Sequence, residues 1–254
     1  MSGVFITGAS SGIGEALARH YAPIAPALGL AARRKVELDA IAAGLSVKCA
    51  TYSLDVTDER AVEQAAKDYV QRFGAPDLVI ANAGISIGTR GDDPADVSKL
   101  RRVLDVNVTG LAATLAAFAP AMRAARSGTL CGIASVAGFR GLPGAGAYSS
   151  SKAAAISWLE ALRIELRGSG VSVVTICPGF IDTPMTQVNR YRMPFLMEVD
   201  RAAEILVDGL ERGKGEIHFP KPLSWTIKTL RILPYPLYQW IIRKATGDRQ
   251  KQAG

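Results

Sequence analysis

The chain has 254 residues, of which 48% are hydrophobic and three are cysteines. This length suits one α/β domain with a substantial core, and the odd number of widely separated cysteines excludes a disulfide framework and a C-x-x-C metal site, so we expect a cytoplasmic location and no metal. Most of the formal charge of +7 belongs to residues 220–254, which hold seven Lys or Arg against one acid, so the charge does not indicate a nucleic-acid partner.

Short apolar runs alternate along the chain with longer segments of helical periodicity. The predicted strands are 3–7, 28–32, 47–54, 78–81, 128–134, 171–177 and 216–219. The predicted helices are 12–21, 36–43, 59–73, 95–123, 148–167 and 201–211. This alternation predicts an α/β fold with a doubly wound parallel β-sheet and helices on both faces. The longest weakly polar stretch, 111–122, is too short to span a bilayer, so we expect no transmembrane segment.

A glycine-rich turn follows the first predicted strand and opens the first predicted helix. It reads Thr7-Gly8-Ala9-Ser10-Ser11-Gly12-Ile13-Gly14. We expect Gly8 to turn the chain off the strand, Gly12 to let the backbone approach a pyrophosphate, and Gly14 to allow close packing of helix on sheet. Ser10, Ser11 and Ile13 are predicted to contact the same dinucleotide. No Gly-Lys-Ser/Thr follows, which disfavours an ATP-type loop, and a glycine-rich turn without a ligand is the alternative.

The end of the second predicted strand indicates which dinucleotide is bound. An acidic side chain there would accept hydrogen bonds from the ribose of NAD, but the run is Ala31-Ala32-Arg33-Arg34. Arg33 and Arg34 can pair with a 2′-phosphate, which favours NADP(H) over NAD(H). Asp55 and Val56, after the third strand, are placed to contact the adenine. The alternative for Asp55 is a helix cap or turn residue.

A phenol and an ammonium group lie four residues apart at the start of a predicted helix. Tyr148 and Lys152 therefore share one helix face. A nearby cation favours phenolate, so Lys152 lowers the pKa expected of Tyr148 and makes proton transfer to or from a substrate oxygen feasible. Ser135 ends the fifth predicted strand and would emerge into the same crevice, where its hydroxyl can hold a developing alkoxide.

Together these motifs resemble the short-chain dehydrogenase/reductase family in order and approximate spacing. The resemblance spans residues 3–219 and rests on the glycine turn, Asn82-Ala83-Gly84, Asn107, Ser135, Tyr148-x-x-x-Lys152 and Pro178-Gly179. It implies a single-domain Rossmann-type fold in which Tyr148 is the acid-base residue, Lys152 also binds the nicotinamide ribose, and Ser135 orients the substrate. Asn107 would complete a water-linked proton relay. Asn82, Ala83, Gly84, Pro178, Gly179 and Thr183 would contact the cofactor.

The resemblance implies an NADP(H)-dependent oxidoreductase that interconverts a carbonyl and an alcohol. The apolar segment 183–200, which includes Met185, Val188 and Tyr191, suits a lid over a small hydrophobic ketone, aldehyde or secondary alcohol. Packing of these side chains on the core or on another subunit is the alternative. We expect a homodimer or homotetramer.

The tail differs in character from the rest of the chain. Residues 1–220 are predicted to form the NAD(P)-binding catalytic domain and residues 221–254 a basic, amphipathic helical extension of it. One interpretation of the extension is peripheral contact with an anionic membrane surface. The other, which we favour because most amphipathic helices face a core, is packing over the cleft or a subunit partner with basic residues facing water.

Two other functions fit parts of the pattern. Ser149 and Lys152 satisfy the S-x-x-K spacing of serine acyl-enzymes, but the accompanying Ser-Asp-Asn and Lys-Thr-Gly elements are absent. A non-catalytic NADP-binding regulator on the same fold is the other alternative, which the complete set of catalytic residue types disfavours.

Overall fold

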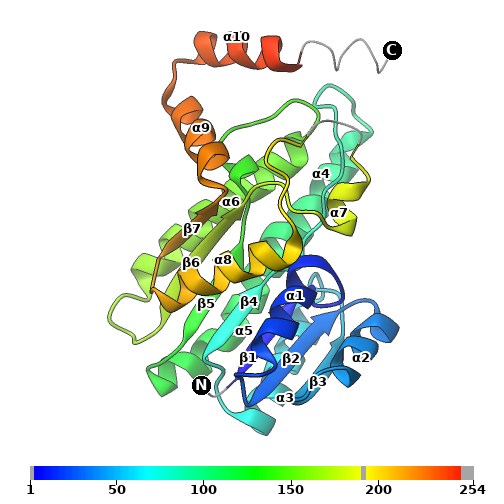
Figure 1. The fold of residues 1–254 in the computed structure, drawn as a ribbon, viewed down its shortest axis with the longest axis vertical. Helices are drawn as coiled ribbons and strands as arrows, with labels where there is room; N and C mark the ends of the chain where they lie inside the picture. Colours follow the sequence, from blue (N-terminus) through cyan, green and yellow to red (C-terminus); the bar gives the residue numbers. More distant parts are fainter. Residues whose placement is uncertain (1–2, 190–192, 247–254) are drawn as a thin grey trace.

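The apolar runs of the sequence form one parallel sheet in the computed structural model, which describes residues 3–189 and 193–246 (Figure 1). Its strands are β1 (Val4–Thr7), β2 (Ala27–Ala32), β3 (Lys48–Ser53), β4 (Leu78–Ala81), β5 (Thr129–Ile133), β6 (Ser172–Pro178) and β7 (Glu216–Phe219). Their order across the sheet is β3-β2-β1-β4-β5-β6-β7, and every adjacent pair is parallel. All residues of β1, β2 and β4 are buried, as expected for strands covered on both faces.

Helices cover both faces of the sheet (Figure 1). They are α1 (Gly12–Tyr21), α2 (Lys35–Ala43), α3 (Glu59–Phe73), α4 (Asp96–Leu104), α5 (Gly110–Ala125), α6 (Gly146–Glu165), α7 (Pro184–Gln187), α8 (Val199–Glu211), α9 (Lys221–Ile232) and α10 (Tyr235–Thr246). One core cluster joins the sheet to α1, α2 and α8, and a second joins it to α3, α5 and α6. The predicted doubly wound architecture is therefore confirmed.

The predicted helix 95–123 is interrupted in the structure. Between α4 and α5 lies one turn of π-helix, η1 (Asp105–Thr109), which carries Asn107. A π-turn inserts one residue into the helical register without breaking the run of apolar residues, so the sequence pattern did not reveal it.

The continuous helical stretch Asp96–Ala125 is long and apolar enough, by length and composition alone, to cross a membrane. Its second part packs in the core with Leu115, Phe118 and Met122 fully buried against the sheet and α3. A helix buried in this way belongs to the core of the protein. Its length and apolar composition are therefore weak evidence that it spans a membrane.

The order of the strands reverses direction at β1 and β4. From β1 the chain builds outward to β2 and β3, and it then returns to add β4 to β7 on the other side. In parallel sheets this switch point opens a crevice beyond the carboxyl ends of the strands, where ligands bind. The glycine-rich turn after β1 and the Asn82 turn after β4 lie at this point.

Candidate active site at the switch point

A cavity of about 510 Å³ lies beyond the carboxyl ends of β1, β2, β4, β5 and β6. Most of the predicted site residues line it, namely Gly8, Ser10, Ser11, Gly12, Ile13, Arg33, Arg34, Asp55, Val56, Asn82, Ala83, Gly84, Ser135, Tyr148, Lys152, Pro178, Gly179 and Thr183. Gly14 and Asn107 are not among the lining residues and lie behind it. The volume is in the range of small-molecule and cofactor sites.

The glycine-rich turn is shaped by close backbone approach. Gly8 and Gly12 have φ values of +67° and +57°, a region that favours glycine. A Cβ atom at Gly14 would lie 2.3 Å from the Gly8 carbonyl oxygen and 2.6 Å from Asn82 Nδ2, so this position excludes any side chain. The turn leads directly into α1, whose first N–H groups favour an anion. This cradle fits the pyrophosphate of a dinucleotide.

Asn82 fastens the turn after β4 to the turn after β1. Its Nδ2 donates to the carbonyl oxygens of Thr7 (3.0 Å) and Gly8 (3.2 Å). Thr7 completes the link, because its Oγ1 accepts from the backbone N–H groups of Asn82 and Ala83. The two loops that form the floor of the cavity are therefore held as one unit.

The two arginines after β2 have different partners. Arg34 reaches across to the glycine-rich turn, with Nη2 3.0 Å from the Ser10 carbonyl oxygen and Nε 3.2 Å from Ser10 Oγ. Arg33 instead pairs with Asp55, at 3.7 Å. Both guanidinium groups are about half exposed at the mouth of the cavity, where a phosphate could displace their present partners.

Asp55 is a turn residue in this structure. Its Oδ1 accepts from the backbone N–H of Thr57 (3.0 Å) and from Thr57 Oγ1 (2.9 Å). The cap of α3 is Asp58, which accepts from the Ala61 N–H. Partial burial raises the pKa of Asp55, but the Thr57 hydrogen bonds and Arg33 outweigh it and leave the pKa below its ordinary value.

Tyr148 and Lys152 lie on the first turns of α6. Lys152 is 4% exposed, its Nζ donates to the Ile133 carbonyl oxygen at 2.8 Å, and it lies 5.7 Å from the centre of the Tyr148 ring. Burial lowers the pKa of Lys152 to about 8, so the group is still largely an ammonium ion at neutral pH. A buried cation therefore lies beside the Tyr148 ring.

Ser135 is positioned by the end of β5. Its Oγ accepts from the Ala137 N–H at 3.1 Å, capping a short 3-10 turn, η2 (Val136–Gly138), and donates to the Pro178 carbonyl oxygen at 3.3 Å. The side chain thus connects the ends of β5 and β6 while facing the cavity.

Asn107 is fully buried behind Gly84. Its amide forms a two-way pair with the backbone of Ile85, at 2.8 and 2.9 Å, and its Nδ2 also donates to Ser151 Oγ at 3.0 Å. A Cβ atom at Gly84 would lie 3.2 Å from Asn107 Oδ1 and 3.5 Å from Lys152 Nζ, so a glycine separates the two groups. The π-turn η1 carries Asn107 and places its side-chain amide next to Gly84. Such turns are frequent at functional sites.

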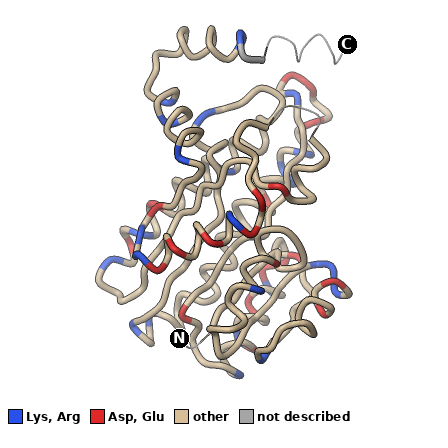
Figure 2. Tube along the Cα trace, viewed as in Figure 1, with Lys and Arg blue, Asp and Glu red and all other residues tan. Residues whose placement is uncertain are grey.

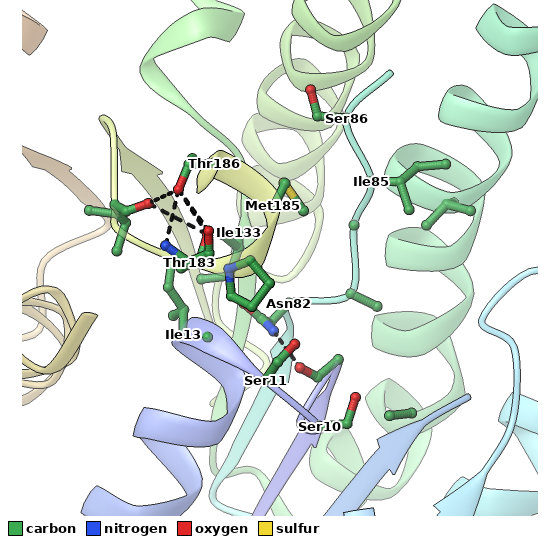
Figure 3. A pocket seen from close by; sticks show the side chains of 18 of the residues that line it. Ser10, Ser11, Ile13, Asn82, Ile85, Ser86, Ile133, Thr183, Met185 and Thr186 are labelled. Carbon is green, nitrogen blue, oxygen red and sulfur yellow. Dashed lines mark hydrogen bonds between the residues drawn. The ribbon is translucent and has the colours of Figure 1, made fainter. Parts of the chain in front are cut away.

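The segment after β6 closes the cavity from above. Thr183 caps α7, its backbone N–H bonds Thr186 Oγ1 at 3.0 Å, and its methyl group would lie 3.1 Å from a Cβ atom at Gly12. Figure 3 shows this turn opposite the start of α1. Met185 and Val188 line the cavity, as expected of lid residues, while Tyr191 lies outside the described residues.

Sequence reasoning missed several residues of the site. Ile85, Ser86 and Val106 line the cavity, and Ser151 supports Asn107. Ile85 and Ser86 directly follow the Asn82-Ala83-Gly84 turn, so proximity in sequence could have found them. Val106 carries no signal, because an apolar residue in an apolar helix is indistinguishable from core.

The described residues disfavour the serine acyl-enzyme alternative. Ser149 is buried, at 3% exposed, and is not among the residues lining the cavity. A nucleophile needs access to its substrate. Among the residues that the structure describes, no group of three or more His, Cys, Asp or Glu side chains could hold a metal ion.

Comparison with known proteins also indicates a dehydrogenase or reductase. The model of a family described as short chain dehydrogenase matches residues 2–193. A protein of Myxococcus xanthus, named as an uncharacterized oxidoreductase, is 41% identical over 244 residues, which cover 94% of this chain and 95% of that protein.

Solved structures share the fold across most of the chain. An alcohol dehydrogenase of Thermococcus sibiricus, complexed with 5-hydroxy-NADP, superposes with a TM-score of 0.77 at 30% identity and covers 85% of this chain and 95% of its own. A short chain dehydrogenase/reductase of Burkholderia phymatum, in complex with NAD, gives a TM-score of 0.80 at 25% identity, covering 89% and 91%. Nicotinamide dinucleotides of both kinds thus occur among the structural neighbours.

Proposed function

Since the chain belongs to the short-chain dehydrogenase/reductase family and is an NAD(P)-dependent oxidoreductase, we propose that it interconverts a carbonyl compound and an alcohol and prefers NADP(H). The observation that carries the proposal is the buried ammonium group of Lys152 beside the Tyr148 ring, at the wall of a cavity whose floor is an anion cradle.

The proton chemistry belongs to Tyr148. Its hydroxyl gives a proton to the carbonyl oxygen in reduction, or takes one from the alcohol in oxidation. The Lys152 cation stabilises the phenolate that reduction leaves behind, and Ser135 turns its hydroxyl from the Pro178 carbonyl toward the substrate oxygen. Asn107 lies next to Lys152 across Gly84 and belongs to a relay that returns the proton from solvent.

A nicotinamide cofactor, when bound, would supply or accept the hydride. The glycine-rich turn from Gly8 to Gly14 would hold the pyrophosphate, with Ser10, Ser11 and Ile13 alongside it. Lys152 would also bind the nicotinamide ribose. The remaining cofactor contacts on this proposal are Arg33, Arg34, Asp55, Val56, Asn82, Ala83, Gly84, Pro178, Gly179 and Thr183.

The acid-base role is tested by Tyr148→Phe. We expect turnover on a panel of small hydrophobic ketones, aldehydes and secondary alcohols, followed by the absorbance of the reduced cofactor, to fall by about 10²- to 10⁴-fold. Binding of NADPH should be retained, because the ring remains. Tyr52→Phe on β3, whose hydroxyl bonds Asp68 far from the cavity wall, is the matched control. Undiminished turnover in Tyr148→Phe would contradict the proposal.

The cofactor preference is tested by Arg34→Ala. Arg34 already bonds Ser10 of the phosphate turn, so we expect it to pair with the 2′-phosphate of NADPH. Loss of that charge-assisted pairing should weaken NADPH binding by roughly 10-fold or more and leave NADH binding unchanged in fluorescence titrations. Arg19→Ala on α1, which removes an exposed arginine paired with Glu15, is the control. Equal affinity of the wild type for both cofactors would refute the preference.

The apolar residues on the substrate side of the cavity favour a small hydrophobic substrate. Ile85, Met185 and Val188 line it, and unbranched methionine adapts to different shapes. We further propose that the enzyme is cytoplasmic and a homodimer or homotetramer, with residues 1–220 as its catalytic domain.

A further inference from the structure

The last two helices differ in charge from the rest of the molecule. Residues 221–246 hold five cations, Lys221, Lys228, Arg231, Arg243 and Lys244, and no acid. Figure 2 shows blue but no red along α9 and α10. The side chains of Arg231, Arg243 and Lys244 are exposed. Lys228 is paired with Glu216 of β7, so the other four cations give this end of the molecule its attraction for anions.

The same two helices expose large apolar side chains to water. On α9, Trp225 is 59% and Ile232 85% exposed, and on α10 Trp240 is 58% exposed. Trp225 and Ile232 are seven residues apart and share a helix face, as do Leu237, Trp240 and Lys244 on α10. Lys244 lies 4.7 Å from the centre of the Trp240 ring. Aromatic rings and long cations on one surface are the side chains found at membrane interfaces.

The opposite face of α9 is fixed to the body of the protein. Leu223 and Ile227 pack into the cluster formed by Phe139 and its neighbours, and Ser224 is fully buried with its Oγ 2.7 Å from His218 Nδ1. The favoured expectation was packing over the cleft or on a subunit partner; in the structure, the inner face of α9 packs on the cluster around Phe139. No residue in the described ranges 3–189 and 193–246 covers the outer face, where Trp225 and Ile232 are exposed.

α10 is held by the loop that follows η2. The Tyr238 hydroxyl donates to the Gly141 carbonyl oxygen, and the Arg140 guanidinium lies 4.2 Å from the Tyr238 ring centre and donates to the Arg231 carbonyl oxygen at 3.1 Å. α10 otherwise stands away from the sheet (Figure 1). The two helices therefore present their aromatic and basic side chains as an ordered surface next to the loop that begins at Ser135.

We propose that this α9–α10 surface docks on an anionic lipid bilayer. Lysine and arginine bind the negatively charged headgroups, and Trp225, Trp240, Ile232 and Leu237 enter the interface, where amphipathic helices bury their apolar face. Because α10 contacts Arg140 and Gly141, docking brings the loop that connects η2 to α6 toward the membrane surface.

The experiment is co-sedimentation of the full chain, with NADPH bound, with vesicles of phosphatidylcholine alone or with phosphatidylserine. We expect binding only to the anionic vesicles, weakened by salt, and a blue shift of tryptophan emission. Arg243→Gln with Lys244→Gln should weaken the partition by about fivefold per cation removed. Trp240→Ala should remove a substantial part of the emission shift, and Trp225 should account for the rest. Turnover of a water-soluble substrate should be unchanged in these variants.

Two matched variants separate the surface from general charge and hydrophobicity. Lys67→Gln removes an exposed cation from α3, and Ile164→Ala removes an exposed apolar side chain from α6. Neither should alter vesicle binding. The proposal is overturned if no vesicle binds, if the α10 variants bind as well as the wild type, or if Trp240→Ala changes only the oligomeric mass, which would assign the surface to a second copy of the chain. Each outcome is independent of the Tyr148 and Arg34 tests.

Discussion

Lys152 keeps an ammonium group almost entirely out of water. Its pKa of about 8 lies below the ordinary 10.5, because burial disfavours the charged form. Below pH 8 the group is protonated in both folded and unfolded chains, and its burial costs about 3 kcal/mol of stability, at 1.36 kcal/mol per pKa unit. Between pH 8 and 10.5 only the unfolded chain holds the proton, so this cost disappears as the pH rises.

We therefore expect Lys152→Met to stabilise the cofactor-free protein at pH 7, by up to about 3 kcal/mol, while removing turnover. The gain should shrink as the pH rises toward 10. Urea unfolding at pH 7 and 9.5 measures both values, with Lys67→Met on the exposed side of α3 as a control that should show no such trend. A gain that does not depend on pH would show that the lysine is not buried as a cation.

Single residues show where prediction from sequence stops. Arg33 and Arg34 are equivalent in the sequence, yet only Arg34 bonds Ser10, because Arg33 points to Asp55. The direction of each side chain depends on how the backbone leaves β2, and on an acid 22 residues further along the chain. The sequence predicts that both arginines are available for a phosphate. The hydrogen bonds in the structure show that only Arg34 is attached to the glycine-rich turn.

At the scale of elements, η2 and α6 touch with no room for a side chain. A Cβ atom at Gly138 would lie 2.7 Å from the carbonyl carbon of Lys152 and 2.8 Å from its oxygen. Gly138→Ala must push η2 and α6 apart and displace Lys152. We expect a loss of about 1–3 kcal/mol of stability, typical of overpacking, and a loss of turnover, measured by urea unfolding and initial rates.

Gly141→Ala is the matched control, because nothing lies within 4 Å of its Cβ position and its φ is ordinary. It should have nearly wild-type stability and activity. If Gly138→Ala were equally harmless, the contact between η2 and α6 would not position Lys152.

The elements were predicted with unequal success. Each end of every strand was predicted within one residue, because most of the strands are short apolar runs that are separated by longer segments of helical periodicity. The short elements η2 and α7 escaped, since three or four residues carry no periodicity. η1 escaped because a π-turn leaves the apolar pattern of its helix intact.

At the scale of the whole molecule, α5 exposes a face without charge. It consists of small apolar residues that are partly or fully exposed, namely Ala112, Ala113, Ala116, Ala117, Ala119 and Pro120. Such a face favours contact with its symmetry copy. We expect light scattering to give two or four times the chain mass of 26.9 kDa, and Ala116→Arg to reduce it. A wild type that has the mass of one chain would contradict this expectation.

The reversal of strand order at β1 and β4 divides the lining of the cavity into an early and a late part of the chain. Segments before residue 60 line the cavity on one side of the switch point, and residues that follow β4, β5 and β6 line it on the other; on the proposed function these would hold the adenosine and the nicotinamide, respectively. On the proposed function, the preference for a coenzyme and the preference for a carbonyl substrate should therefore be separable. Replacing residues 31–37 with the corresponding segment of a relative that uses NAD should switch the coenzyme preference from NADP(H) to NAD(H). The order of turnover rates across the panel of carbonyl compounds should stay the same. A changed order would show that the two parts of the cavity are not independent.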